Sequence, residues 1–288
     1  MRRLRGVTGI TLLLAVVLLA SGCNIFAKDY NQGKTPTPTP TPTPVIAKTD
    51  VTVYYPKITE TDSYLVREVH LLKKTTDLPK TAVEELINGS PTTVGAYKVL
   101  PAATKVLGVK VDAQGLATVD FTADVLQANV GSSGEALGIT SIVNTLTEFP
   151  NIQKVAFTVD GTVDKAMDWW GHVGLSEQPF SRNLAVVQEP LIWVTSPTAN
   201  QVISSPFKIT GSAMVFEATV SYRLKDANGN ILASGITNAS VGAPDRGDFQ
   251  TEVTFKAPAP GKGQLEVFEA SMKDGSDRNK VIIPVVFK

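Results

Sequence analysis

The sequence predicts two folded domains of different class, an α+β domain followed by an all-β sandwich. Three observations support this division. The chain has 288 residues, 43% of them hydrophobic, which suits one or two globular domains. The first part of the globular region mixes β-rich segments with two segments of helical periodicity. In the second part the helical period disappears, and short candidate strands follow one another between turn residues.

The composition argues against several classes of function. Lys and Arg together number 27, as do Asp and Glu, so the formal net charge is zero. A neutral chain lacks the basic footprint of a nucleic-acid-binding protein. Two histidines and one cysteine offer little to metal or nucleophile chemistry. We therefore expect no metal, no cofactor and no nucleic-acid partner.

Residues 1–22 are predicted to be a signal peptide, because Arg2, Arg3 and Arg5 precede an apolar run. The alternative is a short membrane anchor, although the run is shorter than the roughly 20 residues that span a bilayer. The segment from Leu19 to Cys23 resembles a bacterial lipobox, with Ala20 where that pattern usually has Leu. The resemblance implies that Cys23 becomes the mature N-terminus and carries acyl chains such as palmitate, which would hold the protein on the outer face of the cell membrane.

Residues 23–48 are predicted to be a tether. Its centre, Thr35 to Pro44, alternates Thr and Pro, which blocks helix and sheet because proline lacks an N–H group. Such a tract favours polyproline II and spans roughly 30 Å. We expect a stalk that lifts the folded part off the membrane. The alternative is a proline-rich ligand for a partner domain.

Residues 49–185 are predicted to form the α+β domain, in the order β-β-α-β-β-α-β. The first helix pairs Ala82 with Leu86 at i,i+4 and stops before Gly89. In the second helix, Ser132 and Glu135 have the spacing of a capping box. The expected strands are 51–55, 64–72, 106–111, 116–121 and 152–159, and the expected helices are 79–88 and 132–149.

Residues 186–288 are predicted to form an immunoglobulin-like β-sandwich. Alternating apolar and polar residues mark its strands, and Asn228-Gly229 is a strong hairpin turn because both residues accept a positive φ. The expected strands are 191–195, 207–211, 218–225, 231–234, 249–255, 264–270 and 281–287.

Both predicted domains resemble known families. The first resembles the GerMN domain of spore germination and sporulation proteins, through segments such as Leu86-Ile87-Asn88-Gly89-Ser90-Pro91 and Val155-Ala156-Phe157-Thr158-Val159-Asp160-Gly161. The second resembles the immunoglobulin-like domain of bacterial spore germination, through segments such as Ile209-Thr210-Gly211-Ser212-Ala213 and Val267-Phe268-Glu269-Ala270-Ser271. The resemblance implies a noncatalytic role in the cell envelope, as a scaffold or a binding module in sporulation or germination.

Few residues suggest chemistry. His70 and His172 are far apart and lack metal-ligand spacing, so we expect ordinary packed or surface histidines. The alternative to a noncatalytic role is an envelope hydrolase that cleaves cell-wall glycan through paired carboxylates, with Glu217, Glu269 and Asp120 as candidates. We favour the simpler interpretation, in which Phe216 and Phe268 pack inside while the two glutamates bind backbone or charged partners.

Trp169 and Trp170 are the aromatic residues of greatest interest. They form either a platform for sugar rings or a partner, or a plug that closes the core and docks the two domains. The predicted partners are the membrane, through the lipid on Cys23, and either a cell-wall polymer or an envelope protein.

Overall fold

The computed structural model describes residues 47–167, 169–171, 174–256 and 259–288. The predicted signal peptide, Cys23 and nearly all of the predicted tether lie outside these residues. The described residues fall within one compact unit, Ile46–Lys288. Within them, no helix has both the length and the apolar character needed to cross a membrane.

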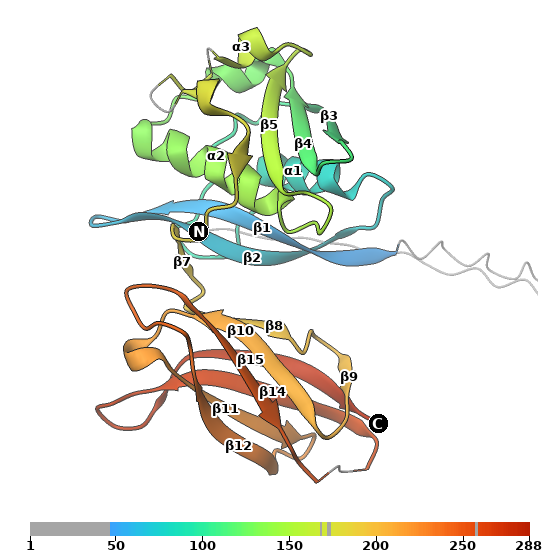
Figure 1. The fold of residues 1–288 in the computed structure, drawn as a ribbon, viewed down its shortest axis with the longest axis vertical. Coiled ribbons are helices and arrows are strands. Elements are labelled where there is room, and N and C mark those ends of the chain that lie inside the picture. Colours follow the sequence, from blue (N-terminus) through green and yellow to red (C-terminus); the bar gives the residue numbers. More distant parts are fainter. Residues whose placement is uncertain (1–46, 168, 172–173, 257–258) are drawn as a thin grey trace, which may run out of the picture. The chain divides into compact units, whose positions relative to one another are not determined.

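The first domain is an α+β domain and contains the predicted β-β-α-β-β-α-β order (Figure 1). Short elements that the sequence did not predict lie within this order and after it. The elements are β1 (Lys48–Ile58), β2 (Ser63–Lys73), α1 (Leu78–Asn88), β3 (Val106–Val111), β4 (Leu116–Phe121), η1 (Ala123–Gln127), α2 (Ser132–Leu146), β5 (Lys154–Val159), α3 (Val163–Met167), η2 (Leu175–Glu177), β6 (Phe180–Ser181) and β7 (Val187–Glu189).

These strands form two sheets. One has the order β1-β2-β7, with a long antiparallel β1–β2 hairpin and β7 parallel to β2. The other has the order β3-β4-β5-β6, in which β4 and β5 run parallel. Helix α2 packs chiefly on β1. Its Ser141 hydroxyl donates to the carbonyl of Tyr54 at 2.5 Å, and the Tyr54 N–H donates to Thr145 Oγ1 at 3.1 Å. The helix thereby satisfies edge groups that an exposed strand would leave unpaired.

The helix ends follow local chemistry. Helix α1 begins after Asp77, whose side chain accepts the N–H of Lys80 at 3.2 Å. The capping box predicted for α2 is wrong, because Gly131 occupies the N-cap and no side chain caps the helix there. Helix α2 also ends at Leu146 rather than at 149. A residue that precedes proline avoids helical dihedrals, so Phe149 does not continue the helix, and residues 147–149 form a turn instead.

The second domain is a β-sandwich, as predicted. Sheet β13-β10-β8 faces sheet β12-β11-β14-β15-β9, and one hydrophobic cluster fills the space between them. The elements are β8 (Ile192–Ser196), β9 (Gln201–Ile203), β10 (Phe207–Ala213), η3 (Phe216–Ala218), β11 (Thr219–Asp226), β12 (Ile231–Asn238), β13 (Gly247–Val253), β14 (Gly261–Ala270) and β15 (Asp277–Phe287).

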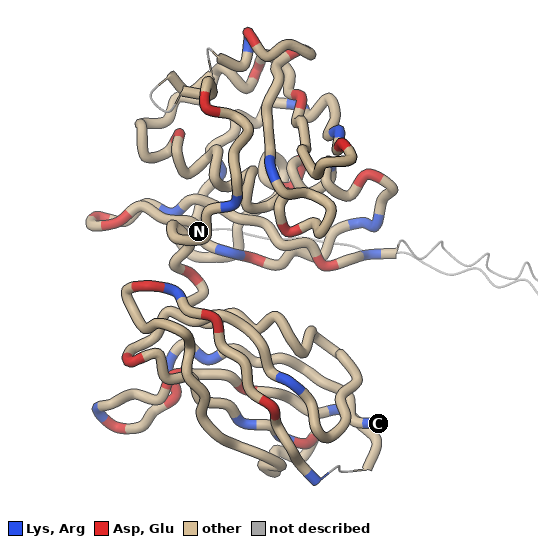
Figure 2. Tube along the Cα trace, in the orientation of Figure 1, with Lys and Arg blue, Asp and Glu red and all other residues tan. Residues whose placement is uncertain are grey.

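The turn between β11 and β12 lies where predicted, but only Gly229, and not Asn228, has a positive φ. Gly229 adopts a φ of +85°, and the Asp226 carboxylate accepts the N–H groups of Asn228 and Asn230 at 2.9 and 2.8 Å. The turn therefore closes a hairpin. Figure 2 shows basic and acidic residues interspersed along both domains, in keeping with the neutral composition.

Candidate functional site

Trp169 and Trp170 lie in the core of the first domain, with 1% and 3% of their surface exposed. Their rings stack on each other at 4.2 Å between centroids, and Trp169 meets Phe121 and Phe157 edge-on at 5.5 Å. Gly138 leaves room for the pair, because a Cβ at that position would lie 2.4 Å from the Trp170 ring. The structure thus places the pair as a core plug, and neither indole offers a face to solvent.

His70 is buried on β2 between two carboxylates. Its Nε2 lies 2.7 Å from Glu68 and its Nδ1 lies 2.7 Å from Glu85. Burial by itself lowers the pKa of His70, but the hydrogen bonds and charges of the two glutamates raise it above its ordinary value. Both ring nitrogens are occupied, so the residue ties β2 to α1. His172 lies outside the described residues.

Glu68 is the most completely bound carboxylate of this cluster. It accepts the N–H groups of Thr92 and Thr93 at 2.8 and 2.7 Å, in addition to its contact with His70. Burial acts to raise its pKa, but these hydrogen bonds prevail and lower the pKa to about 2. The cluster is a structural tie within the first domain.

Two of the three candidate hydrolytic carboxylates, Asp120 and Glu269, hold loops in place. Asp120 accepts Thr158 Oγ1 at 2.9 Å and the N–H of Gly161 at 2.8 Å, which fixes the turn after β5. Glu269 accepts the N–H of Phe216 at 3.1 Å and Asn279 Nδ2 at 2.8 Å. Glu217 is exposed on the short turn η3 with a φ of +50°.

The expectation for the two phenylalanines was half right. Phe268 is buried and lies under the Arg223 guanidinium, 4.6 Å from it. The expectation that Phe216 packs inside is wrong, because Phe216 is 56% exposed. The positive φ values of Glu217 and Ala218 turn the chain there, so Phe216 leaves the strand pattern that would have buried it.

A different tryptophan, Trp193 on β8, lies where residues of the two domains meet. The Arg246 guanidinium lies 4.1 Å from its ring and that of Arg67 lies 5.2 Å away, while Tyr54 meets it edge-on at 6.4 Å. Trp193, Tyr54, Leu65, Leu137 and Val187 form one small buried cluster. Guanidinium groups over an indole contribute about 0.5–2 kcal/mol each.

Arg246 holds the segment that connects the domains. It donates to the carbonyls of Pro190 and Gln188 at 2.7 and 3.0 Å, with longer contacts to neighbouring carbonyls. No carboxylate among the described residues forms an ion pair with it. Burial therefore dominates and lowers the pKa of Arg246 to about 10, which still leaves the side chain charged at neutral pH.

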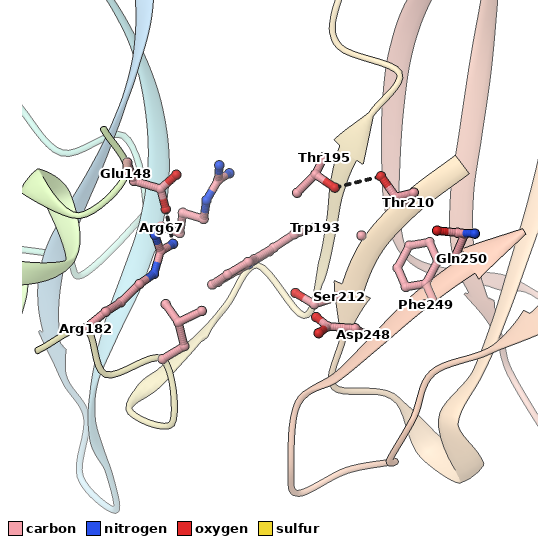
Figure 3. A pocket seen from close by; sticks show the side chains of 12 residues that line it. Arg67, Glu148, Arg182, Trp193, Thr195, Thr210, Ser212, Asp248, Phe249 and Gln250 are labelled. Carbon is pink, nitrogen blue, oxygen red and sulfur yellow. Dashed lines mark hydrogen bonds and ion pairs between the residues drawn. The ribbon is translucent and has the colours of Figure 1, made fainter. Parts of the chain in front are cut away.

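A pocket of about 420 Å³ opens beside Trp193; we call it the junction pocket (Figure 3). Arg67, Glu148 and Arg182 lie on one side of it, and side chains of β8, β10 and β13 lie on the other. Its lining consists of Arg67, Glu148, Arg182, Leu184, Trp193, Thr195, Thr210, Gly211, Ser212, Asp248, Phe249 and Gln250.

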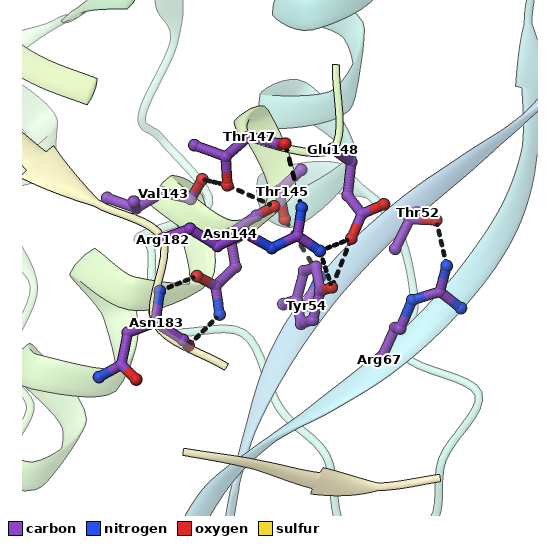
Figure 4. A network of polar contacts seen from close by, with 10 residues as sticks. All are labelled: Thr52, Tyr54, Arg67, Val143, Asn144, Thr145, Thr147, Glu148, Arg182 and Asn183. Carbon is purple, nitrogen blue, oxygen red and sulfur yellow. Dashed lines mark hydrogen bonds and ion pairs between the residues drawn. The ribbon is translucent and has the colours of Figure 1, made fainter. Parts of the chain in front are cut away.

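The first-domain wall of the junction pocket is held rigidly by a polar network (Figure 4). Arg182 forms an ion pair with Glu148, donates to the carbonyl of Thr147 at 3.0 Å and contacts the Tyr54 hydroxyl at 3.1 Å. Tyr54 also donates to Glu148 at 2.5 Å. Burial, and then the charge of Glu148, raise the pKa of Tyr54 above its ordinary value, so the phenol stays protonated as a donor.

Arg67 differs from Arg182 because its charge is not neutralised. It donates a hydrogen bond to Thr52 Oγ1 at 3.0 Å, and no carboxylate among the described residues forms an ion pair with it. A guanidinium has five N–H donors in a planar fork. Arg67 therefore retains donors for an external acceptor at the junction pocket.

Comparisons with known proteins support the two-domain architecture. Residues 52–165 match the family model described as "Sporulation and spore germination", and residues 191–276 match the model described as "Immunoglobulin-like domain of bacterial spore germination". The chain therefore contains a GerMN-type domain followed by a spore-germination immunoglobulin-like domain, as the sequence resemblance implied. Both descriptions name spore germination, one adds sporulation, and neither names a catalytic activity.

Among solved structures, the chain is similar to the tandem GerMN domains of the sporulation protein GerM from Bacillus subtilis. The identity is 24% over 52% of this chain and 51% of that one, with a TM-score of 0.41. The match thus spans about half of the tandem-domain chain. The first GerMN domain of the same protein matches at 28% identity over 39% of this chain and 84% of that one, with a TM-score of 0.35. Both scores lie below 0.5, so we draw no functional conclusion from them. A comparison with curated proteins finds no significant match.

Proposed function

We propose that this protein is a noncatalytic, lipid-anchored binding module of the cell envelope that acts in sporulation or spore germination. The two family matches support the process, and the lipobox-like segment ending at Cys23 supports the anchor. The observation that carries the binding role is the junction pocket, in which Arg67 presents a charge that no described carboxylate neutralises.

The junction pocket has the features of a binding site. Its volume of about 420 Å³ lies within the roughly 300–1,000 Å³ of small-molecule sites. It combines apolar surface from Leu184 and Phe249 with a few polar side chains that can fix a ligand's orientation. The ion pair of Arg182 with Glu148 holds one wall in place before any ligand arrives, which reduces the entropy that binding would cost.

Co-sedimentation with isolated cell wall tests the binding role. The full-length chain, kept soluble in mild detergent, is expected to bind saturably. Arg67→Gln is expected to weaken binding about tenfold, which corresponds to the lower end of the roughly 1.5–3 kcal/mol that a charge-assisted hydrogen bond contributes. Arg278→Gln is the matched control, because Arg278 is exposed and does not line the junction pocket. Absence of saturable binding by the wild type would remove the wall as ligand and leave an envelope protein as the partner to seek.

Labelling with palmitate tests the anchor. The wild-type chain is expected to incorporate the label and to sediment with membranes, because two acyl chains suffice for stable anchoring. Cys23→Ala is expected to lose both properties. A Cys23→Ala chain that still sediments with membranes would contradict lipid anchoring and favour the uncleaved apolar segment as the anchor.

A further inference from the structure

We propose that the junction pocket binds a saccharide that carries one carboxylate group. This inference rests on the proposed binding function and names its ligand class. It follows from three features: a floor of polar side chains on a sheet face, a cation without a counter-charge, and a carboxylate opposite that cation.

The floor of the junction pocket is the outer face of sheet β13-β10-β8. Ser212 on β10 has Trp193 and Asp248 as its cross-strand partners on the neighbouring strands. Thr210 has Gln250 as its partner on β13, and its hydroxyl lies 2.9 Å from that of Thr195 on β8. Two rows of side chains therefore cross the three strands. Neighbouring strands, and so neighbouring side chains within a row, lie about 4.8 Å apart.

This floor suits a saccharide better than a peptide. Peptides that bind sheets usually add a strand at an edge, where free N–H and C=O groups give the affinity. The floor instead offers the side chains of a sheet face, including hydroxyls, an amide and a carboxylate. Each hydroxyl donates one hydrogen bond and accepts two, so the Thr195–Thr210 pair retains capacity for ligand hydroxyls.

Arg67 supplies recognition of an anion. Its planar fork matches a carboxylate, and the hydrogen bond to Thr52 uses only part of its donor capacity. The ring of Trp193 lies beside this guanidinium, 5.2 Å from it, and borders the same pocket.

Asp248 sets the charge of the ligand. It is exposed at the junction pocket, and no described cation forms an ion pair with it. Arg67 can pair with one carboxylate of the ligand, whereas a dianionic phosphate would be repelled by Asp248 more strongly than a carboxylate. The Asp248 carboxylate can in turn accept two sugar hydroxyls.

A matched pair of sugars tests this inference. N-Acetylmuramic acid carries a carboxylate on a lactyl ether, and N-acetylglucosamine is the same ring without it. Titration of the full-length chain in detergent, followed by saturation-transfer NMR, is expected to give a Kd about tenfold lower for the acidic sugar, as one charge-assisted hydrogen bond predicts. Arg67→Gln is expected to remove this preference, so that the two sugars bind with similar affinity.

Two further variants separate the parts of the inference. Thr210→Val removes a floor hydroxyl and is expected to weaken both sugars by a similar factor, whereas Arg278→Gln is expected to change neither. Equal affinity of the wild type for both sugars would overturn the carboxylate. Binding of a small acidic peptide such as Ala-Glu, with no binding of either sugar, would overturn the saccharide. Because wall co-sedimentation is a separate measurement, either result could occur while the proposed envelope function stands.

Discussion

Arg67 and Glu68 are neighbours on β2, yet only the charge of Glu68 is fully bound by partners within the fold. Glu68 points into the first domain, where His70, Thr92 and Thr93 bind both of its oxygens. Arg67 points to the other face, where it meets Thr52 and the ring of Trp193 and lines the junction pocket. Successive residues of a strand face opposite sides, so one step along the chain separates a structural charge from one that is available to a ligand.

Burial determines whether a charged side chain is available to a ligand. Glu68 is only 6% exposed, and a buried charge is tolerated only when it is paired and hydrogen-bonded. Such a group has nothing left to offer a ligand. Arg67 remains partly hydrated, so its incomplete partners cost little and its donors stay free. We therefore expect substitutions in the buried cluster of Glu68, His70 and Glu85 to lower stability, and substitutions at the junction pocket to weaken binding.

The largest expected effect follows from removal of Glu68. Glu68→Ala leaves His70 with one carboxylate and leaves the N–H groups of Thr92 and Thr93 without their acceptor. We expect the free energy of unfolding to fall by about 3–5 kcal/mol, as for other buried pairs that lose one partner. Urea denaturation measures this loss. Glu252→Ala, at an exposed position, is the control, and an equal loss in both variants would contradict the assigned role of the cluster.

The next effect concerns Arg246, which contacts Trp193 and the segment that connects the two domains. Arg246→Ala removes the donors to the carbonyls of Gln188 and Pro190 and uncovers one face of Trp193. We expect a loss of about 2 kcal/mol in the free energy of unfolding. Arg246→Lys keeps the charge but lacks the planar fork, so its loss should be intermediate. Thermal unfolding of the three chains checks this order, and a loss below about 0.5 kcal/mol for Arg246→Ala would contradict it.

The buried cluster also predicts a pH optimum of stability. The raised pKa of His70 stabilises the fold fully below its ordinary value of 6.5, and this contribution disappears as the pH rises through the folded-state pKa. The lowered pKa of Glu68 stabilises the fold above its ordinary value of 4.5, and this contribution disappears as the pH falls toward about 2. Both contributions are complete between pH 4.5 and 6.5.

Denaturation curves across pH test this window. The wild type should lose stability above pH 6.5, because neutral His70 then keeps only one donor for two carboxylates. His70→Gln should abolish that alkaline loss while keeping part of the acidic one. An unchanged alkaline loss in His70→Gln would assign the pH dependence to other groups.

The smallest effect on stability is expected at Arg67. Arg67→Gln should lower the free energy of unfolding by no more than about 1 kcal/mol, the value of a partly exposed cation–π contact such as that with Trp193. The same variant is expected to weaken wall binding about tenfold. A loss of stability as large as that of Glu68→Ala would show that Arg67 is structural and would break the contrast between the two faces of β2.

Much of the fold could be predicted from the sequence, because its longer elements carry their own pattern. Strands β3 and β4 begin and end where predicted, and helix α1 ends at Asn88, before Gly89, as predicted. Strands β6, β7 and β9 have only two or three residues, too few for any period to show. Neighbouring strands, rather than local propensity, hold them in place.

The junction pocket was not predicted, because its residues come together only in the folded chain. The tandem tryptophans attracted attention as a pair, yet they fill the core, whereas Trp193 lies at the junction pocket. One signal was present in β8: Ile192 and Val194 pack on the core of the sandwich, so Trp193 and Thr195 must face outward. A large aromatic side chain on the outer face of a strand indicates a contact with something beyond that sheet.

The most direct test follows the three indole N–H resonances of the chain by NMR while soluble cell-wall fragments are added. Trp193 lines the junction pocket, and Trp169 and Trp170 lie in the core as internal references. The account predicts that the Trp193 resonance shifts saturably, that the other two stay in place, and that Arg67→Gln moves the midpoint to higher concentration. A shift confined to Trp169 and Trp170, or no shift at fragment concentrations where the chain binds intact wall, would contradict the junction pocket as the binding site.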